Sequence, residues 1–167
     1  MRGDRGAMLT LGLGIAAGVV VLDQLSKAVV LAVLSHAELE DSIRVAPFFN
    51  LVLTYNRGVS FGLFNAAGGH GGFQALLFSV VAAVIAVGLV WWLARTATPL
   101  LAVAIGLIVG GAVGNVVDRI RLGAVVDFLD FHIGSWHWPA FNLADSAICL
   151  GVAAMLLDGL LLQRKVT

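Results

Sequence analysis

Carboxylate, amide and basic side chains occur at helical spacings inside otherwise apolar stretches of this 167-residue sequence. Asp23 and Lys27 are four residues apart, with the acid N-terminal to the base, so the two side chains can pair on one face of a helix. Asn142 and Asp145 are three residues apart and also share a face. Ionisable groups in or near hydrocarbon usually face partners or a watery cavity. The spacing therefore indicates acid–base chemistry, proton-coupled transport, or a buried ion pair that joins helices.

A further polar group, formed by Asn115, Asp118 and Arg119, lies on one stripe of a third apolar segment. We expect Asp118 to pair with a neighbouring arginine or to cap the helix end. Small residues repeat at four-residue spacing earlier in this segment: Gly106, Gly110 and Gly114. Because small residues at this spacing let helices approach closely, we expect the polar stripe to be drawn against a neighbouring helix.

The composition excludes an ordinary soluble domain. Hydrophobic residues make up 60% of the chain and charged residues 12%, against about 25% charged in typical soluble domains. Four stretches, at about residues 8–34, 73–93, 99–117 and 141–162, have the roughly 20 apolar residues that a membrane-spanning helix needs. Thr98 and Pro99 suit the N-cap and first position of the third helix. We predict an α-helical integral membrane protein with four transmembrane helices in a single domain, residues 1–167.

The basic residues give a weak orientation signal. One side of the predicted map has Arg2, Arg5, Arg95, Arg164 and Lys165, and the other has Arg44, Arg57, Arg119 and Arg121. Since two of the latter lie in segments with possible chemistry, we expect both termini in the cytoplasm. Arg2 and Arg5 before an apolar run also fit a secretory signal. Apolar residues continue beyond Gly18, however, so we expect no cleavage there.

The two segments on the outer side are long and apolar. Residues 49–56 alternate with strand period, and residues 125–132 are also typical of a strand. These segments predict a small sheet resting on the outer leaflet. Trp136 and Trp138 fit the aromatic belt of a membrane interface better than a ligand site. We also expect Asp130 to face water.

The polar residues share one depth. Asp23 lies about fourteen residues into the first helix, roughly 21 Å along it, and the polar groups of the third and fourth helices fall at the same outer end. A transporter would place polar groups along a path through both leaflets or at the midplane, so this pattern disfavours a small proton-coupled transporter. His132 and His137, beside Asp127 and Asp130, are an alternative metal site. No paired helical histidine motif supports it, and we expect no metal or other cofactor.

Five segments resemble, in order, the motifs of lipoprotein signal peptidases, the signal peptidase II family. The segments are DQLSK at 23–27, NRGVSF at 56–61, GGAVGNVVDR at 110–119, GAVVDF at 123–128 and FNLAD at 141–145. Each segment alone is a weak signal, but five in family order at matching depths are specific. The resemblance covers about residues 8–162.

The resemblance implies a bacterial inner-membrane aspartyl endopeptidase that removes the signal peptide of prolipoproteins, cutting before a diacylglyceryl-modified cysteine. By motif, Asp127 and Asp145 are implied to be the catalytic pair. The residues implied to bind substrate or support the site are Asn115, Arg119, Asn142, Asn56, Asp23 and Lys27. The family's fold implies four transmembrane helices, a small β-cradle and a short extracytoplasmic helix. One chain carries all the motifs, so we expect a monomer.

This chemistry suits paired carboxylates. Amide hydrolysis needs an activated water and a proton for the leaving nitrogen. Like charges a few Å apart cannot both ionise, so one carboxylate serves as base and the other as acid. Arg119, Asn115 and Asn142 offer donors for a substrate carbonyl or a developing oxyanion.

Overall fold

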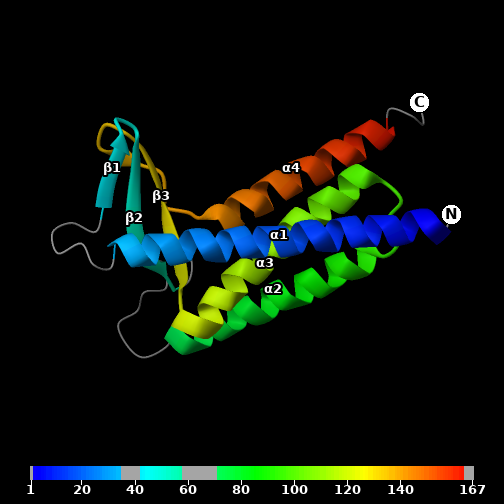
Figure 1. Ribbon diagram of the computed structural model, residues 1–167, viewed down its shortest axis with the longest axis horizontal. Helices are drawn as coiled ribbons and strands as arrows, with labels where there is room; N and C mark the ends of the chain where they lie inside the picture. The colour runs from blue at the N-terminus through cyan, green and yellow to red at the C-terminus, as the bar shows by residue number, and fades with distance from the viewer. Residues whose placement is uncertain (1, 35–41, 58–70, 164–167) are drawn as a thin grey trace.

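The computed structural model describes residues 2–34, 42–57 and 71–163. The helices are α1 Arg2–Leu34, α2 Gly71–Leu93, α3 Pro99–Leu122 and α4 Leu143–Gln163. All four are long and apolar enough to cross a membrane, which confirms the predicted fold class. Figure 1 shows the sheet at one end of the helices, while α1 begins and α4 ends at the opposite end.

Helix α3 is the centre of the bundle. Most of its apolar stretch is buried inside the protein, whereas most of α1, α2 and α4 faces outward. The outward faces carry large apolar side chains such as Val84 and Leu150, which are 66% and 63% exposed. A water-soluble protein rarely exposes so much contiguous apolar surface, so lipid must cover these faces.

Glycines on α3 bring its neighbours close, as their spacing predicted. A Cβ atom added at Gly110 would lie 2.7 Å from the backbone oxygen of Ala16 on α1. On the adjacent side of α3, a Cβ atom at Gly111 would collide with the backbone of Ala144 on α4. Any larger residue at these positions would push the helices apart, and with them the polar groups at the C-terminal end of α3.

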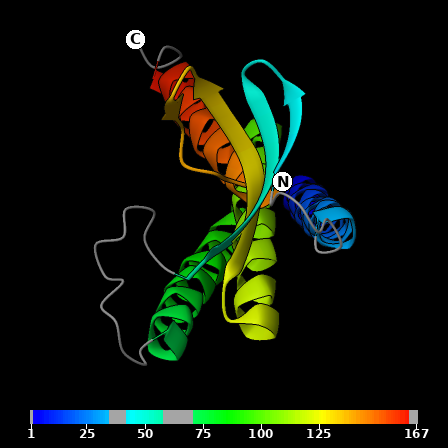
Figure 2. The ribbon, with the colours of Figure 1, turned by 90° about the vertical axis from the view of Figure 1, so that its left-hand side faces the viewer.

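A four-stranded antiparallel sheet closes one end of the bundle (Figure 2). Its strands, in spatial order, are β1 Ser42–Ala46, β2 Phe49–Asn56, β3 Val125–Ile133 and β4 Trp136–His137. Strands β2 and β3 confirm the two predicted strands, whereas β1 and the two-residue β4 were not predicted. The pairing of β2 with β3 shifts register between Leu51 and Thr54. This irregularity places Thr54 opposite Asp127.

Several helix boundaries differ from the predicted ones, and α1 begins at Arg2 instead of about residue 8. Helix α3 continues to Leu122, five residues beyond the predicted end, and stops at Gly123, which has a positive φ of 71° and donates its N–H to Arg119 O. Helix α4 begins at Leu143 because Asn142 is its N-cap. Thr98 stands at the N-cap of α3, but its side chain makes no capping hydrogen bond. The resemblance also implied a short extracytoplasmic helix, and none is present among the described residues.

Candidate active site

The start of α4 is built as a capping box with Asn at the N-cap and Asp at the third position. Asp145 donates its N–H to Asn142 Oδ1 at 2.9 Å, and Asn142 donates its N–H back to Asp145 Oδ2 at 3.2 Å. Two of the helix's unpaired N-terminal groups are satisfied in this way. The negative side chain also sits at the positive end of the helix dipole. The local sequence therefore fixes where the Asp145 carboxylate lies.

Asp145 receives a further donor from the central helix. Asn115 Nδ2 on α3 donates to Asp145 Oδ1 at 2.8 Å. The orientation of this amide is set by Asn115 Oδ1, which accepts from Lys27 Nζ at 3.1 Å and from Asn142 Nδ2 at 3.2 Å. Because two donors occupy the amide oxygen, the amide nitrogen is left to face Asp145.

Asp127 lies on β3 and is only 2% exposed. Asn142 Nδ2 donates to one of its oxygens at 2.7 Å, and Asn56 Nδ2 from β2 donates to the other at 3.0 Å. Burial raises the pKa of Asp127 to about 6, with a further rise from the charge of Asp145. The two amide donors oppose the rise without cancelling it.

Asn142 links the two carboxylates. Its side-chain nitrogen contacts Asp127, and its side-chain oxygen and backbone N–H contact Asp145. The charge of Asp145 acts on the protonation of Asp127. The negative charge of Asp145 therefore disfavours ionisation of Asp127.

A buried ionic cluster lies beneath the pair. Lys27 Nζ contacts Asp23 Oδ2 and Asp118 Oδ2, each at 2.8 Å, and Asn115 Oδ1. These side chains are all less than a tenth exposed. The three donors of the ammonium group are therefore satisfied, which is what a buried charge requires. Asp118 was expected to pair with a neighbouring arginine or to cap the helix end, but its ion pair is with Lys27 from α1, which lies 91 residues earlier in the chain.

The cluster holds backbone on both sides of the site. Asp118 Oδ2 accepts the N–H of Val126 at 3.1 Å, directly before Asp127. Asp23 Oδ1 accepts the N–H of Ala144 at 3.0 Å, directly before Asp145. A single ionic cluster thus sets the backbone position of each aspartate.

Gln24 is a site residue that the sequence argument missed. Its Nε2 donates to Asp118 Oδ1 at 2.9 Å, and its Oε1 accepts from Arg121 at 3.2 Å. The sequence signal that could have identified it is a polar amide beside Asp23 inside an otherwise apolar helix. Gln24 therefore connects the ionic cluster to the C-terminal end of α3.

Arg119 lies next to the pair with unused donors. Its guanidinium sits over the ring of Phe78 on α2, 5.8 Å from the ring centroid, and its Nη1 makes a long 3.4 Å contact to Asn115 O. Its Nε is buried without a hydrogen-bond partner among the described atoms. Asp145 and Asp127 both interact electrostatically with the guanidinium. A buried donor without a partner carries a cost, which a carbonyl oxygen entering the site would relieve.

The histidines lie apart from this network. The rings of His132 and His137 stack 4.8 Å apart, and His137 Nδ1 contacts both oxygens of Asp130 at 2.9 and 3.0 Å. Asp130 was expected to face water, but it is 6% exposed. Burial opposes its ionisation, yet hydrogen bonds from Asn50 and His137 lower its pKa. Within the described ranges, no three His, Cys, Asp or Glu side chains form a possible metal site.

The fold and this carboxylate pair are those expected of a membrane-embedded aspartic peptidase. The model of the signal peptidase (SPase) II family matches residues 15–161. The chain is 47% identical to a lipoprotein signal peptidase of Paraburkholderia phymatum, over 93% of this chain and 90% of that protein. It is 43% identical to one of Ralstonia nicotianae, over 98% of this chain and 90% of that protein.

Solved structures agree. A bacterial membrane enzyme solved by the in meso method superposes with a TM-score of 0.73 at 32% identity, covering 89% of this chain and 87% of that one. The chain therefore belongs to the signal peptidase II family. Residues 58–61 of the second motif segment lie outside the described residues, and the other four segments meet at the end of the bundle that carries the sheet.

Proposed function

We propose that this chain is an aspartic endopeptidase in which Asp127 and Asp145 form the catalytic pair, and that it removes signal peptides from prolipoproteins. The observation that supports this assignment is the link through Asn142, which contacts both carboxylates and keeps them within electrostatic reach of each other. Family membership gives the reaction class, and the geometry supports the assignment of these two residues.

The proposed reaction uses the single proton of the pair. The ionised carboxylate takes a proton from water as the water oxygen attacks the scissile carbonyl carbon. The protonated carboxyl then gives its proton to the leaving amide nitrogen as the C–N bond breaks. Each carboxyl group ends in the opposite state, and one proton exchange with solvent resets the pair.

Other residues support this step. Arg119 carries a fixed positive charge and an unpaired Nε donor beside the pair, and it holds the substrate carbonyl. Asn115, Asn142 and Asn56 orient the aspartates by direct hydrogen bonds. Asp23 and Lys27 act at a distance by fixing helix and strand backbone.

The position of the site along the helices indicates its depth in the membrane. The pair lies where the sheet meets the bundle, so the cut takes place near one membrane surface. We place this surface outside, with both termini in the cytoplasm, in the bacterial inner membrane. A site at this depth leaves the acyl chains of a diacylglyceryl-modified cysteine in lipid while the peptide bond beside it is cut. Residues 1–167 act as one domain and as a monomer, without metal or other cofactor.

A proton-coupled transporter is the alternative class. Apart from Asp158 toward the other end of α4, the buried acidic and basic residues of the described chain gather near the sheet, and the family match favours the peptidase.

A gel-shift cleavage assay tests the proposal. Purified protein in detergent is mixed with a diacylglyceryl-modified prolipoprotein, and the unlipidated precursor is the matched control. We expect cleavage of the lipidated substrate alone. Absence of cleavage by well-folded protein would overturn the assignment, and equal cleavage of both precursors would remove the role of the lipid.

A further inference from the structure

The two faces of the sheet differ in chemistry. Strand alternation places Asp127, Leu129, Phe131 and Ile133 of β3 on one face. This face is apolar beyond Asp127, with Phe49 of β2 stacked on Phe131 at 4.8 Å. The other face is polar only toward the far end of β3, with the contact group Asn50, Asp130 and His137, while nearer the bundle Phe128 is buried against Val30 and Leu34 of α1. An amphipathic sheet at a membrane surface presents its apolar face to lipid.

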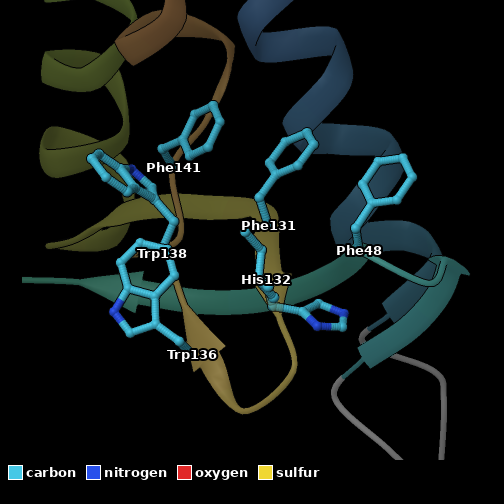
Figure 3. A pocket seen from close by; sticks show the side chains of 7 residues that line it. Phe48, Phe131, His132, Trp136, Trp138 and Phe141 are labelled. Atoms are coloured by element: carbon cyan, nitrogen blue, oxygen red, sulfur yellow. The ribbon is translucent and has the colours of Figure 1, made fainter.

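A cavity of about 540 Å³ opens at the far end of the apolar face. Its walls are almost wholly apolar, and Phe48, Phe131, Phe141, Trp136 and Trp138 form most of them (Figure 3). In Figure 3 the rings of Phe48, Phe131 and Phe141 point toward the side on which the helices lie. The cavity therefore faces the hydrocarbon beside the bundle and not the aqueous side of the sheet.

Phe141 of the cavity wall and the proposed catalytic pair are adjacent along the chain. Phe141 O accepts the N–H groups of Phe128 and Leu129 at 3.0 and 2.8 Å. Phe141 directly precedes Asn142, which contacts both aspartates. Along β3, Phe131 is four residues from Asp127, a distance of about 13 Å. One leaflet of a membrane has a hydrocarbon depth of about 15 Å, so an acyl chain attached at the site spans this distance.

We propose that the aromatic cavity at the end of the sheet binds one acyl chain of the lipid-modified substrate and thereby helps to align the scissile bond. The inference rests on the proposed function. Peptide backbone is a poor occupant because the walls would leave its amide groups without hydrogen bonds. An acyl chain has no such groups and fits a cavity of rings.

Photolabelling tests the occupant directly. The unaltered chain in lipid nanodiscs is mixed with prolipoprotein that carries a photoreactive group near the end of one acyl chain, and labelled peptides are mapped by mass spectrometry. The matched arm uses a phospholipid with the same photoreactive chain. We expect the substrate to label residues 131–141 more strongly than the phospholipid does. Equal labelling by both, or labelling of the helices alone, would overturn the inference.

Kinetics test the consequence. Trp138→Ala removes one wall of the cavity, and Ile133→Ser changes another side chain that lines it and is 80% exposed, so this change costs little in folding. Trp91→Ala is the matched control, since Trp91 is 61% exposed and stacks with Arg95 at the opposite end of the bundle. An acyl chain that moves from the bilayer into the cavity was not in contact with water before, so it gains only the closer packing against the cavity walls. We therefore expect KM to rise about three- to tenfold in both cavity variants, with kcat nearly unchanged.

The failures of the two proposals are distinguishable. With the unaltered chain, shortening the acyl chains should raise KM, and Trp138→Ala should weaken that dependence. If cleavage proceeds and both cavity variants keep the parent's KM for every chain length, the inference is wrong and the peptidase assignment stands. If the unaltered chain cleaves nothing, the peptidase assignment is wrong and photolabelling alone decides whether the cavity binds acyl chains.

Discussion

Asp127 and Asp145 reach the same place from two different kinds of backbone. Asp145 belongs to the first turn of a helix, where the capping box holds it within four residues of chain. Asp127 belongs to a strand, and its position depends on β2 and on α3 through Asn56 and Asp118. One aspartate is fixed locally, and the other is fixed by contacts across the fold.

The difference explains why the ionic cluster lies between them. The carboxylates of Asp145 and Asp127 keep a constant relative position only if a rigid contact joins the elements that hold them. Lys27 does so, since it contacts Asp118 on the Asp127 side, and Asp23 and Asn115 on the Asp145 side. Variants that act on one aspartate or on both therefore separate local from long-range support.

The largest effect is expected at the pair itself, where the two aspartates should behave alike despite their different supports. Asp127→Asn and Asp145→Asn should each lower kcat about a thousandfold, because either change removes one half of the proton exchange. Initial rates of prolipoprotein cleavage measure this. Asp158→Asn is the control, as Asp158 is a buried aspartate at the other end of α4. Substantial activity in either pair variant would show that the two are not equivalent.

Next in size is the loss of Lys27, which should affect both supports at once. Lys27→Met keeps the side-chain length but leaves Asp23 and Asp118 as buried charges without a counter-ion. Breaking a buried pair in this way costs about 3–5 kcal/mol. Thermal unfolding in detergent measures it, with the exposed Arg95→Met as control. We expect Lys27→Met/Asp118→Asn to recover part of the loss, and a parent-like melting temperature in the single variant would refute the linking role.

Much of the fold was predictable from local patterns. Apolar length alone defined four helices, and the alternation at 49–56 defined β2. The helical spacing of Asp23 and Lys27 placed them on one face, where the structure also has them. These features depend on residues near each other in the chain, so periodicity and spacing carry the information.

Long-range contacts were not predictable. The partner of Asp118 is on another helix, and no local pattern distinguishes Lys27 from a neighbouring arginine. Asp130 was expected to be exposed because it is a charged residue on a strand. Asp130 instead contacts His137 in β4, and a strand of two residues is too short to show a periodic pattern. Likewise, the aromatic cavity needs side chains from three segments.

A smaller effect should distinguish the supports of the two aspartates. Asn115→Ala removes the α3 donor to Asp145, and Asn56→Ala removes the β2 donor to Asp127. An unpaired buried acceptor costs about 1–3 kcal/mol, so kcat/KM should fall about ten- to a hundredfold in each. Steady-state kinetics measure this. Asn115→Ala also frees Lys27 from one acceptor, so it should lower the melting temperature more than Asn56→Ala does. The reverse order would contradict the assignment of long-range support to the Lys27 cluster.

The smallest expected effect is on protonation. The pKa of Asp127 is raised from 3.8 to about 6, so the folded protein favours the neutral carboxyl. The resulting stabilisation is fully present below pH 3.8 and is lost as pH rises through about 6. Relative to Asp127→Asn, the parent's melting temperature should therefore fall over this window. Asn56→Ala should raise the pKa further, because a donor to the ionised form is lost, whereas Asp145→Asn should lower it by removing a nearby charge. Infrared titration of the carboxyl band measures both shifts, and an unchanged or raised pKa of Asp127 in Asp145→Asn would show that the two aspartates do not act on each other as a pair.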